Sequence, residues 1–213
     1  ELDAIAREAA IAPPAVVEGA HFGHRHRARL MVRGRARSPK IGIFQAGTHD
    51  VVDIPRCRVH HPLVNDVGAA LREAIRATGT RPYTERTHSG ALRAVQIVVE
   101  RASRTAQLVL VGNATTPEPL TALADALGDG LGARLHSLWW NGNPERTNTI
   151  LGPHWKHLRG PDAVCESVCG ADVFFPPGAF GQSHLELADA LVARVHAWVP
   201  DGERVAEYYA GCG

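Results

Sequence analysis

Cysteine, long apolar runs and net charge are all scarce in this sequence of 213 residues. The four cysteines have no tight framework spacing, which argues against a disulfide-stapled secreted domain and favours a reducing, cytoplasmic setting. No apolar run approaches membrane-spanning length, so we expect no membrane partner. The formal net charge is only +1, but this near-neutral total conceals a strongly basic segment early in the chain.

An initiator methionine and a signal peptide are missing as well. The chain begins at Glu1 inside a helical pattern and stops at Gly213 inside a loop pattern. We therefore expect both ends to be cut from a longer protein, which we expect to be a monomer. The 45% hydrophobic content is enough for one large or two small cores.

Apolar periodicity predicts an α+β fold with largely antiparallel pairing over residues 1–172. Helices are expected at 1–11, 62–78, 116–127 and 183–199. Strands are expected at 25–33, 40–45, 51–54, 91–100, 107–111, 135–140, 149–151, 163–168 and 171–174, and in the apolar run after Arg204. In the last helix Leu187, Leu191, Val195 and Trp198 should face inward.

The basic segment is a predicted strand with two unlike faces. Ala28, Leu30 and Val32 point one way and should pack. The other face carries four arginines, namely Arg25, Arg27, Arg29 and Arg33. A solvated sheet face accounts for most charge runs, but this stripe is denser than solubility needs. It favours contact with the phosphate backbone of a nucleic acid.

Two sets of residues raise the question of a metal. Cys57 alone is typical of a buried small hydrophobe. The spacing of His154, His157, Cys165 and Cys169 could in principle hold zinc, although it matches no common zinc template. The two later cysteines fall in a strand pattern and share a face, so packing is the simpler interpretation.

The chain closes on an apolar run followed by Gly211-Cys212-Gly213. A strand followed by Gly-x-Gly begins the nucleotide-cofactor loop of doubly wound α/β domains, because glycine lets the backbone approach the ligand closely. By itself this pattern is weak, and an ordinary strand end explains it equally.

Taken together, five segments in order resemble the S-adenosylmethionine-dependent RNA (uracil-5-)-methyltransferases, which modify tRNA and 23S rRNA. They are 22–30, 41–57, 148–152, 174–182 and 208–213. The resemblance implies a central RNA-binding α+β domain at 1–172. It also implies that 173–213 form the first helix and strand of an α/β class I methyltransferase domain.

The same resemblance assigns roles to individual residues. Gln182, Tyr209 and Gly211 match cofactor-binding positions for S-adenosylmethionine, and the arginine strand matches the one that faces structured RNA. Cys57 matches the fourth ligand of an iron–sulfur cluster, but its three partners lie upstream of the segment matched here. Three departures from the family pattern stand out: His24 replaces a usual Tyr, Gly181 an apolar or aromatic residue, and His184 a usual Asn.

In this family a cysteine thiolate adds to C6 of uracil, and a carboxylate later removes the C5 proton. Both residues lie downstream of the cofactor loop, so this chain is expected to lack its catalytic residues. We expect the intact protein to methylate C5 of uridine and the chain alone to be inactive. An RNA-binding module without catalysis and a zinc-binding structural protein are the alternatives.

Overall fold

A mixed sheet is the centre of the fold in the computed structural model, which describes residues 2–206 and 208. In chain order the elements are α1 (Leu2–Glu8), β1 (Arg27–Arg35), β2 (Ser38–Phe44), β3 (Val51–Asp53), α2 (Pro62–Thr78), β4 (Leu92–Glu100), β5 (Thr105–Gly112), η1 (Glu118–Leu120), α3 (Thr121–Leu131), η2 (Gly132–Arg134), β6 (Leu135–Gly142), β7 (His154–Arg159), β8 (Val164–Val168), β9 (Ala171–Phe175) and α4 (Leu185–His196).

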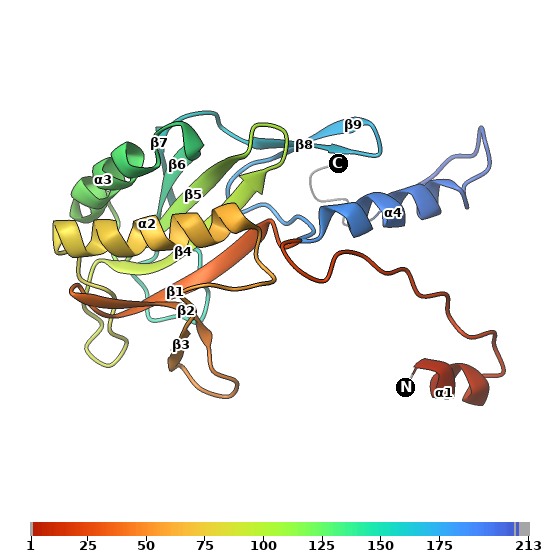
Figure 1. The fold of residues 1–213 in the computed structure, drawn as a ribbon, viewed down its shortest axis with the longest axis horizontal. Helices are drawn as coiled ribbons and strands as arrows, with labels where there is room; N and C mark the ends of the chain where they lie inside the picture. Colours follow the sequence, from red (N-terminus) through yellow and green to blue (C-terminus); the bar gives the residue numbers. More distant parts are fainter. Residues whose placement is uncertain (1, 207, 209–213) are drawn as a thin grey trace.

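The sheet has the strand order β3-β2-β1-β4-β5-β6-β7, and β8 and β9 form a separate hairpin (Figure 1). Every ladder in the large sheet is antiparallel except that of β5 with β6. That parallel pair needs a crossover, which α3 supplies. The predicted α+β class with largely antiparallel pairing is therefore confirmed for this part of the chain.

Helices α2 and α3 cover one face of the sheet (Figure 1). Helix α2 begins with Pro62, whose fixed φ suits the first turn, and stops at Gly79, which adopts a left-handed φ of 66°. Its apolar stripe, including Val67, Leu71 and Ile75, is fully buried against the sheet. The opposite face of the sheet carries a smaller apolar cluster of Met31, Ala94 and Val111, and buried polar side chains such as Gln96 and Gln107 lie on the same face.

The hairpin of β8 and β9 is tied to the sheet by charge. The Glu166 carboxylate, 5% exposed, accepts from the backbone N–H of Arg101 at 2.8 Å and from its Nε at 2.7 Å. Glu100 accepts from the backbone N–H of Cys165 at 2.7 Å. These contacts fix the hairpin beside the end of β4. After β9 the chain continues to Gln182.

Several sequence expectations are wrong in detail. Residues 149–151 form no strand, and β7 was not expected. Residues 204–206 are not in a strand either, and residue 207 and residues 209–213 lie outside the described part of the chain. Leu191 and Val195 of α4, and Trp198 just after it, are 56%, 43% and 70% exposed rather than inward. No helix in the described part of the chain is both long and apolar enough to cross a membrane.

Candidate nucleic-acid interface

Strand β1 divides its side chains between the two faces of the sheet as predicted. Ala28, Leu30 and Val32 join the core under the helices. Arg27, Arg29, Met31 and Arg33 alternate with them and therefore lie on the opposite face. Arg25 precedes the strand; it is exposed, and its Nε donates to the carbonyl of Arg27 at 3.2 Å.

Specific partners hold the arginines of this stripe. Arg27 donates from Nη1 to the carbonyl of Ala179 at 2.8 Å and lies over the Phe175 ring at 5.2 Å. Arg29 donates from Nε to Oε1 of Gln96 at 2.7 Å. The stripe is thus a row of guanidinium groups held in defined positions rather than a freely solvated fringe.

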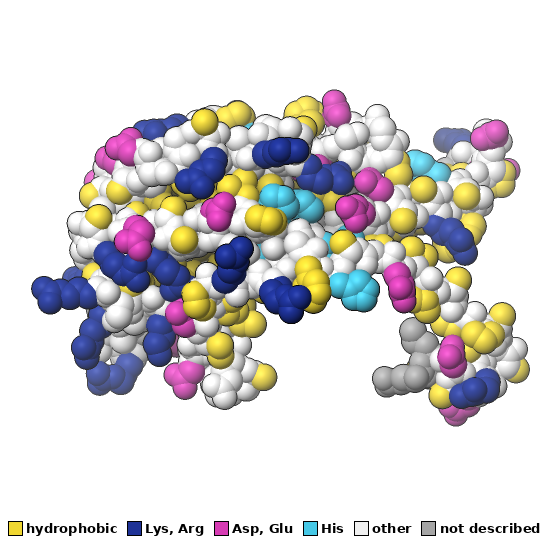
Figure 2. Space-filling model, viewed as in Figure 1, with side chains coloured by type: hydrophobic (Ala, Val, Ile, Leu, Met, Phe, Trp, Pro, Cys, Tyr) yellow, Lys and Arg dark blue, Asp and Glu magenta, His cyan; other side chains and the backbone are white. Residues whose placement is uncertain are grey.

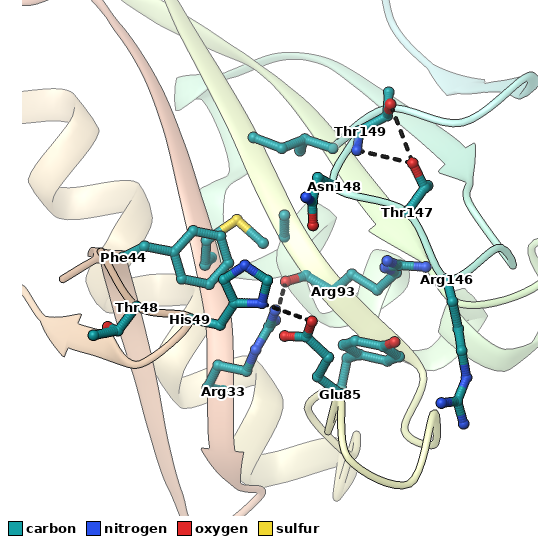
Figure 3. Close-up of a pocket in the computed structure, with 14 residues that line it drawn as sticks. Arg33, Phe44, Thr48, His49, Glu85, Arg93, Arg146, Thr147, Asn148 and Thr149 are labelled. Atoms are coloured by element: carbon teal, nitrogen blue, oxygen red, sulfur yellow. Dashed lines mark hydrogen bonds and ion pairs between the residues drawn. The ribbon is translucent and has the colours of Figure 1, made fainter. Parts of the chain in front are cut away.

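A cavity of about 450 Å³ opens at the Arg33 end of the stripe (Figure 3). Its lining comes from β1, the end of β2, the loop before β3, the loop before β4, β4 itself and the loop before β7. The lining residues are Met31, Arg33, Phe44, Thr48, His49, Tyr83, Glu85, Arg93, Ala94, Arg146, Thr147, Asn148, Thr149 and Ile150.

Tyr83 anchors the cavity wall between two cations. Its ring is 2% exposed, with the Arg33 guanidinium 5.2 Å and the Arg93 guanidinium 4.4 Å from the ring centroid. Arg33 also lies 5.5 Å from the Phe44 centroid and donates to the carbonyl of Arg93 at 3.0 Å. Burial lowers the pKa of both arginines below the ordinary value, yet guanidinium groups stay charged at neutral pH.

The other walls carry polar groups. His49 Nδ1 lies 2.7 Å from Glu85 Oε1 and joins two loops across the cavity mouth. Asn148 projects from its loop into the cavity, and Arg146 lies at the rim and extends away from the other cations (Figure 3). The Thr147 hydroxyl accepts from the backbone N–H of Thr149 at 3.2 Å, which shapes this loop.

A broader hollow of about 930 Å³ adjoins the cavity and shares Arg33, His49, Tyr83 and Glu85 with it. Arg35, Lys40 and Arg86 add cations to its lining. Figure 2 shows Lys and Arg side chains gathered at this end of the molecule, near the hairpin of β1 and β2. The basic face therefore continues past the cavity, which is the arrangement that a phosphate backbone needs.

The predicted cofactor residues do not form a pocket in the described structure. Gln182 is exposed at the rim of a cavity of only about 10 Å³, beside Arg27 and Phe175. Tyr209 and Gly211 lie outside the described residues. The described part of the chain thus brings Gln182 to the Arg27 end of the stripe and shows nothing of its two expected partners.

The predicted metal ligands do not come together either. The backbone of Cys57 exchanges two hydrogen bonds with the side chain of Asn65. His157 stacks on Trp139 at 4.3 Å, whereas Cys169 donates to the carbonyl of Asp189 in α4. Among the described residues no group of three or more His, Cys, Asp or Glu is placed to hold a metal. The zinc interpretation of His154, His157, Cys165 and Cys169 is therefore wrong for this part of the chain.

The three departures from the family pattern have structural counterparts. His24 and His184 stack on each other with ring centroids 4.4 Å apart, so the two unusual residues form one contact. A Cβ at Gly181 would lie 2.7 Å from Nη2 of Arg27. A larger residue at position 181 would thus displace the guanidinium from its place beside Phe175.

Sequence reasoning named only one lining residue of the cavity as a site residue. It singled out Arg33, but not Tyr83, Glu85 or Arg93. One signal was available: Arg93 interrupts the apolar strand Leu92-Arg93-Ala94-Val95 and is buried. A buried arginine in such a run requires several acceptors, and Arg93 finds them in the carbonyls of Asn143 and Glu145.

Comparisons with known proteins agree with this picture. No protein-family model matches the chain. A protein from Protochlamydia amoebophila named an RNA methyltransferase is 36% identical over 206 residues, which cover 94% of this chain and 54% of that protein. One so named from Geobacter sulfurreducens is 31% identical over 192 residues, covering 89% and 39%. The chain thus spans about half or less of the length of these relatives.

Among solved structures, the tRNA (uracil-54, C5)-methyltransferase of Pyrococcus abyssi, in complex with S-adenosyl-L-homocysteine, matches with a TM-score of 0.75. The match covers 93% of this chain and 46% of that chain at 20% identity, so it shows a common fold. The chain is therefore similar to proteins named RNA methyltransferases and shares the fold of a tRNA (uracil-54, C5)-methyltransferase, in line with the predicted resemblance to the RNA (uracil-5-)-methyltransferase family.

Proposed function

We propose that this chain is the RNA-binding part of an S-adenosylmethionine-dependent RNA (uracil-5-)-methyltransferase that acts on C5 of uridine in tRNA or rRNA. Residues 1–172 form the central domain and 173–213 begin the cofactor domain. The observation that carries this proposal is a convergence in space. Arg33 belongs to the arginine strand, and His49 and Asn148 belong to two of the segments that resemble the family. All three line one cavity on the basic face.

The chemistry of that face supports RNA as the partner. Arginines held by aromatic rings and backbone carbonyls offer fixed cations to phosphates, and exposed loops offer polar edges to bases. The neighbour's complex with S-adenosyl-L-homocysteine supports S-adenosylmethionine as the methyl donor. The cavity beside Gln182, of about 10 Å³, is too small for a whole cofactor.

An iron–sulfur cluster finds no support in the residues described. Cys57 is the only cysteine that the resemblance assigns to a cluster, and the described residues gather no ligand set around it.

The test compares the protein encoded by the full reading frame with the 213-residue chain. Each is incubated with methyl-labelled S-adenosylmethionine and total RNA, and the digested nucleosides are separated. We expect label in 5-methyluridine with the intact protein and none with the chain alone. Label confined to another nucleoside overturns the uracil-C5 assignment. Methyl transfer by the 213-residue chain alone overturns the proposal that this chain only binds RNA.

One alternative has a specific observation in its favour. The basic cavity is complete within the described residues, so RNA binding does not require a catalytic domain. A natural RNA-binding module without catalysis would look the same. The reading frame beyond Gly213 separates the two, because a methyltransferase continues into a helix and further strands.

A further inference from the structure

The cavity at Arg33 is distinct from the region that carries Gln182. Both adjoin β1, but Gln182 lies by Arg27 and the cavity lies by Arg33. A strand rises about 3.3 Å per residue, so these six steps separate the two places by about 20 Å. One stacked nucleotide rises about 3.4 Å, so the separation corresponds to several nucleotides of RNA.

The interior of the cavity suits a flat apolar group. Met31 and Ala94 face each other across the β1–β4 ladder and form part of the lining with Ile150. The Phe44 ring, 36% exposed, lies at the side. The volume of about 450 Å³ falls within the range of about 300–1,000 Å³ that is typical of small-ligand sites. A nucleobase is a planar group that such surfaces stack against.

The charges inside and outside the cavity differ. Arg33 and Arg93 already donate to backbone carbonyls and stack on Tyr83. Glu85 adds a carboxylate to the same wall, which disfavours a bare phosphate in the interior. Arg146 lies at the rim instead (Figure 3), where a phosphate keeps its contact with water.

A polar side chain suited to hydrogen-bond the edge of a base also lines the cavity. The loop of residues 146–150 is held from beneath, because Asn143 Nδ2 donates to the carbonyls of Thr149 at 2.7 Å and Ile150 at 3.1 Å. The Asn148 side chain therefore projects into the cavity from a fixed loop. An amide offers both a donor and an acceptor to a base.

We infer that this cavity holds one unstacked nucleotide of the substrate RNA, several nucleotides away from the uridine that is methylated. The base lies inside against Phe44, its edge meets Asn148, and its phosphate meets Arg146 at the rim. This second subsite contributes to the choice of RNA rather than to methyl transfer. It rests on the proposed function in taking RNA as the partner and Gln182 as the mark of the side that holds the methylated uridine.

The experiment measures binding of the 213-residue chain to a fluorescein-labelled RNA hairpin with a randomised loop, over a series of salt concentrations. Phe44→Ala is compared with Phe22→Ala, which removes an exposed ring outside the cavity. We expect Phe44→Ala to weaken binding roughly tenfold with an unchanged salt slope, because base stacking is lost but no phosphate contact is. Phe22→Ala should leave the affinity as it is.

A charge-matched pair completes the design. Arg146→Ala and Arg37→Ala each remove one exposed arginine, but only Arg146 lines the cavity. With 5-iodouridine in the loop, irradiation should crosslink the RNA to the peptides that carry Phe44, Tyr83 or residues 146–150. Arg146→Ala should lower the salt slope by about 1 and reduce that crosslink. Arg37→Ala should preserve the crosslink.

The outcomes separate this inference from the proposed function. If the chain does not bind RNA at all, both fail. If it binds with a clear salt slope, but Phe44→Ala and Asn148→Ala bind as tightly as the unaltered chain and crosslinks map elsewhere, the subsite alone is overturned. A loss with Phe44→Ala that Phe22→Ala does not share, together with a crosslink in the cavity, establishes it.

Discussion

The two ends of strand β1 carry the same residue type in unlike settings. At one end Arg27 binds Phe175 and the carbonyl of Ala179, both from the segment that leads to Gln182. At the other end Arg33 lies between Phe44 and Tyr83, in the wall of a cavity. One end of the strand thus joins the sheet to the segment that carries Gln182, and the other forms part of the wall of a cavity.

This difference shows that an arginine stripe is not a uniform electrostatic feature. Each guanidinium has a flat face and directed donors, so its neighbours decide what it does. Five changes test the contrast between the two ends, from the largest expected effect to the smallest.

Tyr83→Ala removes the ring that anchors the cavity end. Truncating a buried aromatic side chain costs about 3–5 kcal/mol, so we expect a large fall in the free energy of unfolding. Tyr83→Phe loses only the hydroxyl contact to His88 Nδ1 at 2.8 Å and should cost about 1 kcal/mol. Urea unfolding measures both, and equal losses would show that the hydroxyl rather than the ring is the anchor.

Glu166→Ala releases the hairpin at the Arg27 end. Breaking a buried pair costs about 3–5 kcal/mol, but Arg101 is partly exposed, so we expect about 2 kcal/mol. Limited proteolysis should then cut within the hairpin of β8 and β9. Glu73→Ala is the control, since it removes an exposed pair with Arg76 and should cost less than about 0.5 kcal/mol. Equal costs would refute the anchoring role of Glu166.

Asp53→Ala loosens the sheet edge beside the cavity. The Asp53 carboxylate accepts from the backbone N–H of Ile41 at 2.8 Å and lies 2.9 Å from Nη1 of Arg72, which is buried. We expect a loss of about 1–2 kcal/mol, because both donors lose a partner. Asp53→Asn keeps an acceptor and should cost less. Thermal unfolding distinguishes the two, and an order reversed from this one contradicts the assignment.

The stacked pair of His24 and His184 at the Arg27 end should show coupling. A double-mutant cycle with alanine at both positions should give a coupling energy of about 0.5–1 kcal/mol, as for stacked rings elsewhere. The same cycle on His24 and His49, which lies at the cavity end, serves as the control and should give none. Strictly additive losses at His24 and His184 would show that the stack contributes nothing.

The smallest expected effect is a change in how the stability of the fold depends on pH. Burial lowers the pKa of His26 and His61 below 6.5, and their rings lie 4.9 Å apart. The unfolded chain therefore takes up protons first as the pH falls below about 6.5, so stability is complete above that value and declines as the pH falls through the folded pKa. His61 Nδ1 also caps α2 by accepting from Leu63 N–H. His61→Asn keeps a cap without titrating, so unfolding measured across this range should show a shallower pH dependence.

Much of the fold could be predicted from local patterns in the sequence. Helix α2 begins and ends where its apolar periodicity, Pro62 and Gly79 place it. The alternation in β1 correctly separated the core face from the arginine face. These predictions succeed for the same reason: the side chains that are buried against a neighbouring layer are apolar, and this leaves a periodic pattern in the sequence.

The predictions fail where a segment is held by side-chain hydrogen bonds or by contacts with distant parts of the chain, because these leave no periodic pattern in the sequence. Residues 149–152 are held by the Asn141 and Asn143 amides rather than by a strand ladder. Strand β7 is mostly exposed, so it shows no apolar alternation, and its two histidines stood out only as part of a spacing that could in principle hold zinc. The cavity joins Arg33, Tyr83 and Asn148 across more than a hundred residues, and no local pattern reports such a meeting.

The pairing of Met31 with Ala94 across β1 and β4 also sets an order for folding. That ladder closes a long loop of chain, so its entropic cost comes before its contacts stabilise anything. The loop of residues 146–150 is synthesised later still. A chain emerging from the ribosome therefore carries the arginines of β1 before the last segment of the cavity wall has been made.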